Sequence, residues 1–311
     1  MFAVAFVLGL MPESDVDERS KARGQSVAVV GELPTAAGGS QTVPFLPPDC
    51  RCRPGTLFQW SSAPNVTGGP DLSAPLVTDR PDFTEASVTV GLGVTQLEMG
   101  YTYAYDTDEL TASHSYGEPL LRQGIFADWL ELRVALFPTQ EWERDGDVRD
   151  RHAGTEDMYF GFKVALTPQA GWLPEMALIP QLNLPTGSRA FSSETVEPGL
   201  NWVYGWEVSD FISTGGSSQA NRRVDDAEHT YLEIAQSWTV GYSLTDRLGA
   251  FTECFALFPS GADVALPEYY FDCGFTYLIN DNIQYDVRYG VGLNDAAVDY
   301  FVGTGLSVRF L

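Results

Sequence analysis

The sequence predicts an all-β fold: a transmembrane antiparallel β-barrel of about 12 strands that follows a flexible N-terminal extension. Two patterns carry this prediction: apolar and polar residues alternate strictly from residue 94 onward, and the connections alternate between short and long. Composition agrees, because a net charge of −24 accompanies 44% hydrophobic residues. That balance argues against a disordered chain. The acidic charge argues against nucleic acid or anionic lipid headgroups as partners.

The first 77 residues show no sustained period. Residues 1–11 resemble the apolar part of a secretory signal, but no Lys or Arg precedes them and no small-x-small cleavage site follows closely. A degenerate signal from a truncated or misassigned start and a working signal are both open interpretations. Residues 12–77 contain clusters of Gly, Pro, Ser and Thr, which predict a flexible periplasmic extension. The longest uncharged apolar run, residues 2–11, is about half of the ~20 residues that a membrane-spanning helix needs.

Residues 78–311 form the predicted barrel domain, and its strands are recognised by a period of two. In the first clear strand, Leu97, Met99 and Tyr101 alternate with Glu98 and Gly100. The same alternation recurs at residues 130–136, 158–166, 178–184, 200–208, 232–244, 271–277, 283–291 and 300–310, with weaker segments at about 110–124, 211–220 and 248–258.

The connections between these segments alternate in length. Residues 126–128, 209–210, 245–247 and 280–282 are short, whereas residues 138–154, 185–197, 218–229 and 259–267 are long and polar. Tight turns on one side and long loops on the other are typical of outer-membrane barrels. With an even number of strands, both ends of the barrel and the N-terminal extension lie on the periplasmic side.

A soluble β-sandwich or ligand-binding barrel would also show alternating strands. Its exposed face needs abundant charge, but here the non-apolar face is rich in Gly, Ala, Ser and Thr and carries only a few charges. Aromatic residues also gather at strand ends, as in interfacial girdles. Both observations favour the membrane barrel in the outer membrane of a double-membraned bacterium.

Several motifs within residues 78–311 resemble a family of outer-membrane β-barrel transporters known as phenol degradation meta-pathway proteins, to which the functional-amyloid secretion barrel is related. They are TDRPDFTE at 78–85, LEMGYTY at 97–103, DWLELR at 128–133, LPTG at 184–187, EPGLN at 197–201, TDRL at 245–248 and GLND at 292–295. The resemblance implies a twelve-stranded pore that transports a solute or polypeptide, without enzymatic activity. The amyloid-secreting relatives place a coiled-coil plug before the barrel, but residues 12–77 show no heptads, so a passive or selective channel is the better expectation.

Alternation places eleven charged side chains in the predicted lumen. Acidic groups outnumber basic ones, which predicts a pore that attracts cations. The alternative is that these charges pair across the lumen and merely fill it. The predicted lumen and selectivity residues are Glu98, Glu131, Arg133, Lys163, Glu207, Glu233, Glu253, Asp272, Asp286, Arg288 and Arg309.

The family motif Asp79, Arg80, Pro81 and Asp82 directly precedes the first clear strand. One interpretation folds this segment into the periplasmic mouth, with Arg80 bound to a lumen carboxylate through a bidentate contact. The other interpretation is a polar linker that caps the first turn.

Cysteine and histidine give weaker signals. Cys254 and Cys273 face the same side of adjacent strands, so they could form a cross-strand disulfide or remain lipid-facing thiols. Cys50 and Cys52 have no nearby His, which argues against a metal site. A lipase of the outer membrane would need a His and a Ser on one face, but the serines beside His114 point to the opposite face. Neither a phosphate-binding glycine loop nor HExxH occurs, and no enzymatic activity, cofactor or metal is predicted.

The functional prediction is therefore an outer-membrane channel or transporter for a small solute, with a preference for cations. A structural or adhesin-like barrel without transport and a polypeptide secretion pore are the alternatives. The expected partners are outer-membrane lipid and a transported solute. The sequence does not decide whether the protein is a monomer or a homo-oligomer.

Overall fold

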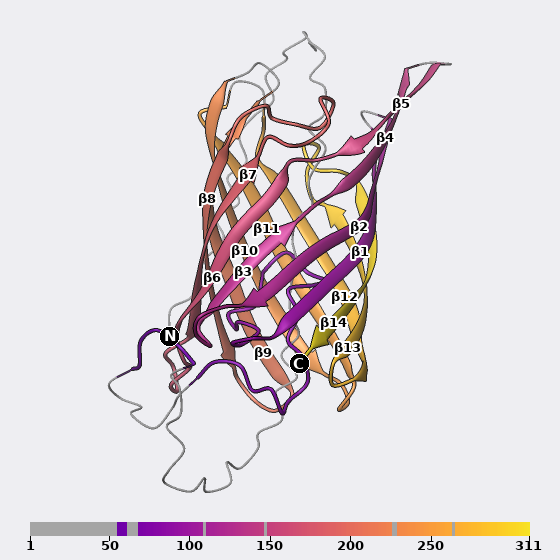
Figure 1. Cartoon of the computed structure of the whole chain (residues 1–311). Helices are drawn as coiled ribbons and strands as arrows, with labels where there is room; N and C mark the ends of the chain where they lie inside the picture. Colours follow the sequence, from indigo (N-terminus) through magenta and orange to yellow (C-terminus); the bar gives the residue numbers. More distant parts are fainter. Residues whose placement is uncertain (1–54, 61–67, 108–109, 146–147, 226–228, 263–264) are drawn as a thin grey trace, which may run out of the picture.

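The computed structural model describes residues 55–60, 68–107, 110–145, 148–225, 229–262 and 265–311. Fourteen strands of these residues form a single antiparallel sheet that closes on itself through β1 and β14 (Figure 1). The strands are β1 (Thr95–Asp106), β2 (Thr111–Gly124), β3 (Leu130–Ala135), β4 (Pro138–Asp145), β5 (Val148–Thr155), β6 (Met158–Thr167), β7 (Glu175–Leu184), β8 (Glu197–Glu207), β9 (Ile212–Val224), β10 (Thr230–Ser243), β11 (Leu248–Ser260), β12 (Glu268–Asn280), β13 (Ile283–Gly292) and β14 (Tyr300–Phe310).

The barrel itself has twelve strands because two of its strands are interrupted. The lower part of β2 pairs with β3, and its upper part pairs with β4. Likewise β6 pairs with β3, whereas β5 pairs with β4. The chain thus runs through β3 into β4 and returns through β5 into β6, and each pair counts as one barrel strand. The predicted barrel of about 12 strands is confirmed.

One predicted loop is wrong. Within this range, strands β4 and β5 pair as a hairpin that extends beyond the barrel rim (Figure 1). Strands β9 and β11 also continue into the predicted long loops, to Val224 and Ser260. A ribbon that projects past the membrane has no face to bury in lipid, so its sequence lacks the apolar period on which the strand prediction depends.

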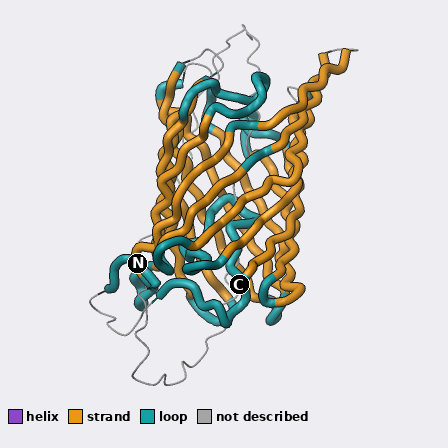
Figure 2. Tube along the Cα trace, in the orientation of Figure 1, coloured by secondary structure: helices purple, strands orange, loops and turns teal. Residues whose placement is uncertain are grey.

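The two faces of the barrel have opposite character. Outward-facing side chains such as Trp202 and Trp238 are 43% and 47% exposed, whereas the inward-facing side chains of Glu98 and Lys163 are fully buried. The apolar band therefore faces lipid and the charged face lines the interior. In the described part of the chain, which is strand and loop in Figure 2, no helix is long and apolar enough to cross a membrane.

The short connections lie at the rim where β1 begins and β14 ends (Figure 1). They comprise residues 125–129, 168–174, 208–211, 244–247 and 281–282. The turn at 168–174 is absent from the predicted short connections, because its Pro and Trp residues obscure the strand ends. By the loop asymmetry of outer-membrane barrels, this rim is the periplasmic one.

Residues 76–94 form no strand but lie inside the barrel, and we call them the inner segment (Figure 1). Its side chains are largely buried, among them Asp79, Arg80, Asp82 and Phe83. The barrel thus encloses a length of its own chain in its periplasmic half.

The described parts of the N-terminal extension also contact the barrel. Leu57 and Phe58 donate backbone hydrogen bonds to the carbonyl oxygens of Ala165 and Leu166 at the end of β6, at 2.8 and 2.7 Å. Leu76 donates to the carbonyl of Asp281 at 2.8 Å. The predicted signal at 1–11 and the cysteines at 50 and 52 lie outside the described residues.

Candidate functional site

The inner segment is held by a buried carboxylate that meets three cations from three strands. Asp79 forms ion pairs with Lys163 of β6 at 2.6 Å, with Arg122 of β2 at 3.2 Å and with Arg133 of β3. All four side chains are at most 1% exposed. A carboxylate without such partners would be costly to bury, so these contacts determine where the inner segment sits.

The same cations bind further carboxylates. Arg122 pairs with Glu131 at 2.7 Å and with Glu98 at 3.0 Å, and Arg133 pairs with Glu85 of the inner segment at 2.8 Å. The resulting Asp79 network contains Asp79, Glu85, Glu98, Glu131, Arg122, Arg133 and Lys163, or four acidic and three basic groups. Pairing therefore neutralises most of the charge in this part of the lumen.

Arg80 reaches the opposite wall of the barrel. Its guanidinium contacts Glu118 through Nη1 at 2.7 Å and Asp286 through Nε and Nη2 at 3.4 and 3.5 Å. Gly100 and Gly305 face each other on β1 and β14, and a Cβ on either would come within 2.3 Å of the guanidinium. The two glycines thus leave the space that Arg80 occupies.

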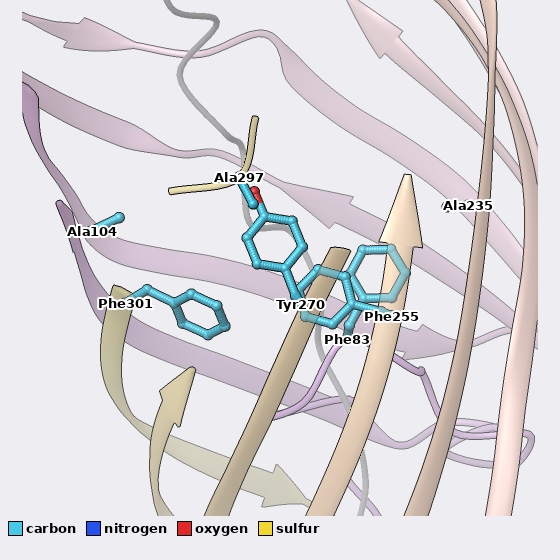
Figure 3. Close-up of a cluster of buried hydrophobic side chains, with 7 residues drawn as sticks. All are labelled: Phe83, Ala104, Ala235, Phe255, Tyr270, Ala297 and Phe301. Carbon is cyan, nitrogen blue, oxygen red and sulfur yellow. The ribbon is translucent and has the colours of Figure 1, made fainter. Parts of the chain in front are cut away.

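An aromatic stack joins the inner segment to β11 and β12 (Figure 3). The ring of Phe83 stacks on Phe255 with centroids 4.5 Å apart, and Phe255 stacks on Tyr270 with centroids 4.6 Å apart. Phe301 of β14 packs against both at larger angles. These rings are buried inside the barrel rather than exposed to lipid.

Three carboxylates lie beside this stack. Glu253 of β11 stands directly opposite Asp272 of β12, and it accepts hydrogen bonds from the backbone N–H groups of Phe83 and Thr84. Asp82 accepts a hydrogen bond from Thr239 at 2.8 Å. Within the described residues none of the three carboxylates forms a salt bridge, although each is at most 1% exposed. We call Asp82, Glu253 and Asp272 the acidic triad.

Nine of the eleven predicted lumen residues are buried in the interior. The structure brings Glu98, Glu131, Arg133 and Lys163 into the Asp79 network, Glu253 and Asp272 into the acidic triad, and Asp286 and Arg288 against the inner segment at Arg80 and Pro81. Arg309, the ninth buried residue, instead binds the carbonyl of Ala74. The two that are not buried are Glu207, which is exposed at the end of β8, and Glu233, which pairs with Arg223 at 3.2 Å.

Sequence reasoning missed Arg122 and Glu118, both of β2. In this strand Leu120 is buried and Leu121 is 39% exposed, so apolar residues on both faces conceal the period. Glu118 sits in an irregularity where Gly117 and Glu118 both have positive φ, 73° and 36°. Faces cannot be assigned by alternation across such a bulge. Arg122 is two residues from Leu120, and this spacing was the signal that could have placed both side chains on the same face of β2.

Of the two alternatives for Cys254 and Cys273, the structure has the free thiols and not the disulfide. The two face the same side but are offset in register, because Cys254 pairs with Phe271 and Cys273 with Thr252. Diagonal neighbours of this kind are about 7–8 Å apart, too far for a disulfide.

Other candidate chemistry is sparse in the described residues. They contain no group of three or more His, Cys, Asp or Glu side chains that could hold a metal ion. His114 lies on the outer face, where its Nδ1 is 2.8 Å from the Tyr101 hydroxyl. Between β5 and β6, burial raises the pKa of Glu156 to about 7, opposed by a hydrogen bond from the Thr139 hydroxyl at 2.7 Å.

The closed barrel, its apolar outer face and its charged interior define the class of protein: a transmembrane β-barrel of the bacterial outer membrane. The family described as "Putative MetA-pathway of phenol degradation" matches residues 78–310. The chain belongs to this family, which confirms the resemblance seen in its motifs.

A solved structure supports the fold, and two further ones are similar at lower TM-scores. The COG4313 outer membrane channel from Pseudomonas putida F1 superposes with a TM-score of 0.59 at 11% identity, over 70% of this chain and 96% of that one. The NanC porin (TM-score 0.45, 9% identity) and the KdgM porin (0.44, 11%) each match 70% of this chain and 100% and 99% of their own. No curated protein sequence matches the chain.

Proposed function

We propose that this protein is a channel for a small solute and that its lumen prefers cations. The observation that carries the proposal is the acidic triad, three buried carboxylates for which the described residues supply no salt bridge. Paired charges cancel one another at a distance, but unpaired carboxylates inside a low-dielectric wall focus a negative potential along the lumen.

The charges of the Asp79 network support the alternative view that lumen charges only fill space, since every member has a partner there. The triad differs because the backbone and hydroxyl groups that donate hydrogen bonds to it are neutral: the N–H groups of Phe83 and Thr84 and the hydroxyls of Thr84 and Thr239. Neutral donors add no positive charge to the triad. We therefore assign the cation preference to the triad rather than to the whole set of lumen residues.

The test is a reversal-potential measurement in planar bilayers under a KCl gradient. The unmodified protein should favour K⁺ over Cl⁻, and the preference should fall at high salt because charges are screened within about 3 Å at 1 M. Glu253→Gln together with Asp272→Asn should reduce the preference. Glu197→Gln serves as the control, since it removes a buried carboxylate that pairs with Arg223 at 3.0 Å.

A preference for Cl⁻, or an unchanged preference in the double variant, would contradict the proposal. A protein that migrates as a folded barrel yet conducts no ions would instead indicate a structural barrel without transport.

A further inference from the structure

We propose that the acidic triad and the ring of Phe255 form a binding site for an ammonium cation that carries an aromatic ring two carbons from its nitrogen. The inference rests on the proposed function and deepens it by naming the class of solute. The observation that supports it is the position of Phe83 of the inner segment, which contacts both Glu253 and Phe255.

The site has two consecutive rungs on the interior face of β11 and β12. Glu253 faces Asp272 on one rung, and two residues further along Phe255 faces Tyr270 on the next. Side chains two residues apart on a strand share a face, so carboxylates and rings adjoin. This combination recognises organic cations, which form hydrogen bonds with the acids while their apolar part packs on the rings.

None of the three carboxylates forms a salt bridge within the described residues, although the charge of Arg288 acts on Asp272, which also contacts Glu253. Both oxygens of Asp272 and Oδ1 of Asp82 are buried without a hydrogen-bond donor among the described residues, and the two side chains are 1% and 0% exposed. Asp82 lies close enough to Glu253 and Asp272 for their charges to interact. Buried charges of one sign are unfavourable unless a counter-charge joins them.

Phe83 of the inner segment shows what such a ligand would look like. Its backbone N–H donates to Oε2 of Glu253, while its ring stacks on Phe255 with the planes inclined by only 4°. The nitrogen, Cα, Cβ and ring of a phenylalanine are the skeleton of phenethylammonium. The inner segment therefore presents a neutral copy of this cation to the site.

A free phenethylammonium would make the same two contacts and would also supply a positive charge to the triad. Binding requires the segment around Phe83 to move aside, which lowers the apparent affinity by the fraction of molecules in which it has done so. A metal ion is the poorer candidate, because no group of described His, Cys, Asp or Glu side chains has the arrangement to hold one.

Calorimetric titration of the full chain in detergent micelles tests the site. Phenethylammonium should bind, whereas ethylammonium, which lacks the ring, and phenylacetate, which reverses the charge, should bind at least about tenfold more weakly. Glu253→Gln and Asp272→Asn should each weaken phenethylammonium binding about tenfold or more.

Two further variants separate binding from loss of structure. Phe83→Ala removes the competing ring and should tighten phenethylammonium binding several-fold, a gain that a damaged barrel would not show. Glu197→Gln, which lies outside the triad, should leave the affinity unchanged. Heat-modifiable migration on a denaturing gel confirms that each variant is a folded barrel.

Equal binding of phenylacetate and phenethylammonium would overturn the inference, as would an unchanged affinity in both Glu253→Gln and Asp272→Asn. A channel that prefers K⁺ in bilayers but does not bind phenethylammonium would overturn this inference and leave the proposed function standing. A channel that prefers Cl⁻ would overturn the proposed function, on which the inference rests.

Discussion

Replacing Asp79 by Asn should release the inner segment from the barrel wall. The Asp79 carboxylate is fully buried and pairs with Arg122, Arg133 and Lys163. Net charge alone would predict that the inner segment is held more firmly, because the variant changes the Asp79 network from four acids and three bases to three of each. Local pairing predicts a loss, since the salt bridge with Asp79 is the only one of Lys163 in the described residues.

The expected magnitude follows from the cost of leaving a buried charge without its partner. Removing one member of a buried ion pair typically costs about 3–5 kcal/mol. That cost would lower the protection of the inner-segment amides against hydrogen exchange by about two orders of magnitude or more. The informative amides are those of Phe83, Thr84 and Val90, which donate to Glu253 and Glu131 rather than to Asp79 itself.

Hydrogen exchange followed by mass spectrometry measures this effect, with the strand amides of the same sample as an internal reference. The matched control is Asp71→Asn, which makes the same change at an exposed carboxylate that accepts hydrogen bonds from Ser73 and forms no salt bridge in the described structure. Conductance should also rise in Asp79→Asn, because the inner segment crosses the lumen. Unchanged protection at the three amides would refute the reasoning.

Three further predictions use other parts of the barrel. The pKa of Glu156 is raised from 4.5 to about 7. The stability contributed by its protonated carboxyl group is therefore fully present below about pH 4.5 and is lost as the pH rises through 7, and the loss is about 3 kcal/mol at most. The temperature of the gel-mobility shift should therefore fall between pH 5 and pH 8, and Glu156→Gln should flatten that dependence. Gly100→Ala should displace the adjacent guanidinium and speed exchange of the inner segment at a cost of about 1–3 kcal/mol, unlike Gly205→Ala, where the nearest atom is 3.6 Å from the new Cβ. Cys254 and Cys273 should both react with a thiol reagent after unfolding without reductant, and protection of both would contradict the free-thiol structure.

The sequence by itself determined the barrel. A strand's side chains alternate faces whatever its neighbours are. The period of two therefore identified nine strands, which three weaker segments brought to about twelve, and it assigned Glu98, Lys163 and Asp286 to the interior. The same local rule failed where the strand is interrupted or bulged, at the β4–β5 hairpin and at Glu118.

Only the tertiary structure decided which interior charges meet. Asp79 is 43 residues before Arg122 and 84 before Lys163, and their contact depends on how the closed barrel is staggered and on where the inner segment enters it. Register likewise separates Cys254 from Cys273, although both face outward. Alternation tells only whether a side chain points into or out of the barrel. Which side chains meet depends on their positions around and along the barrel, and these positions are set by strand register and by closure of the sheet.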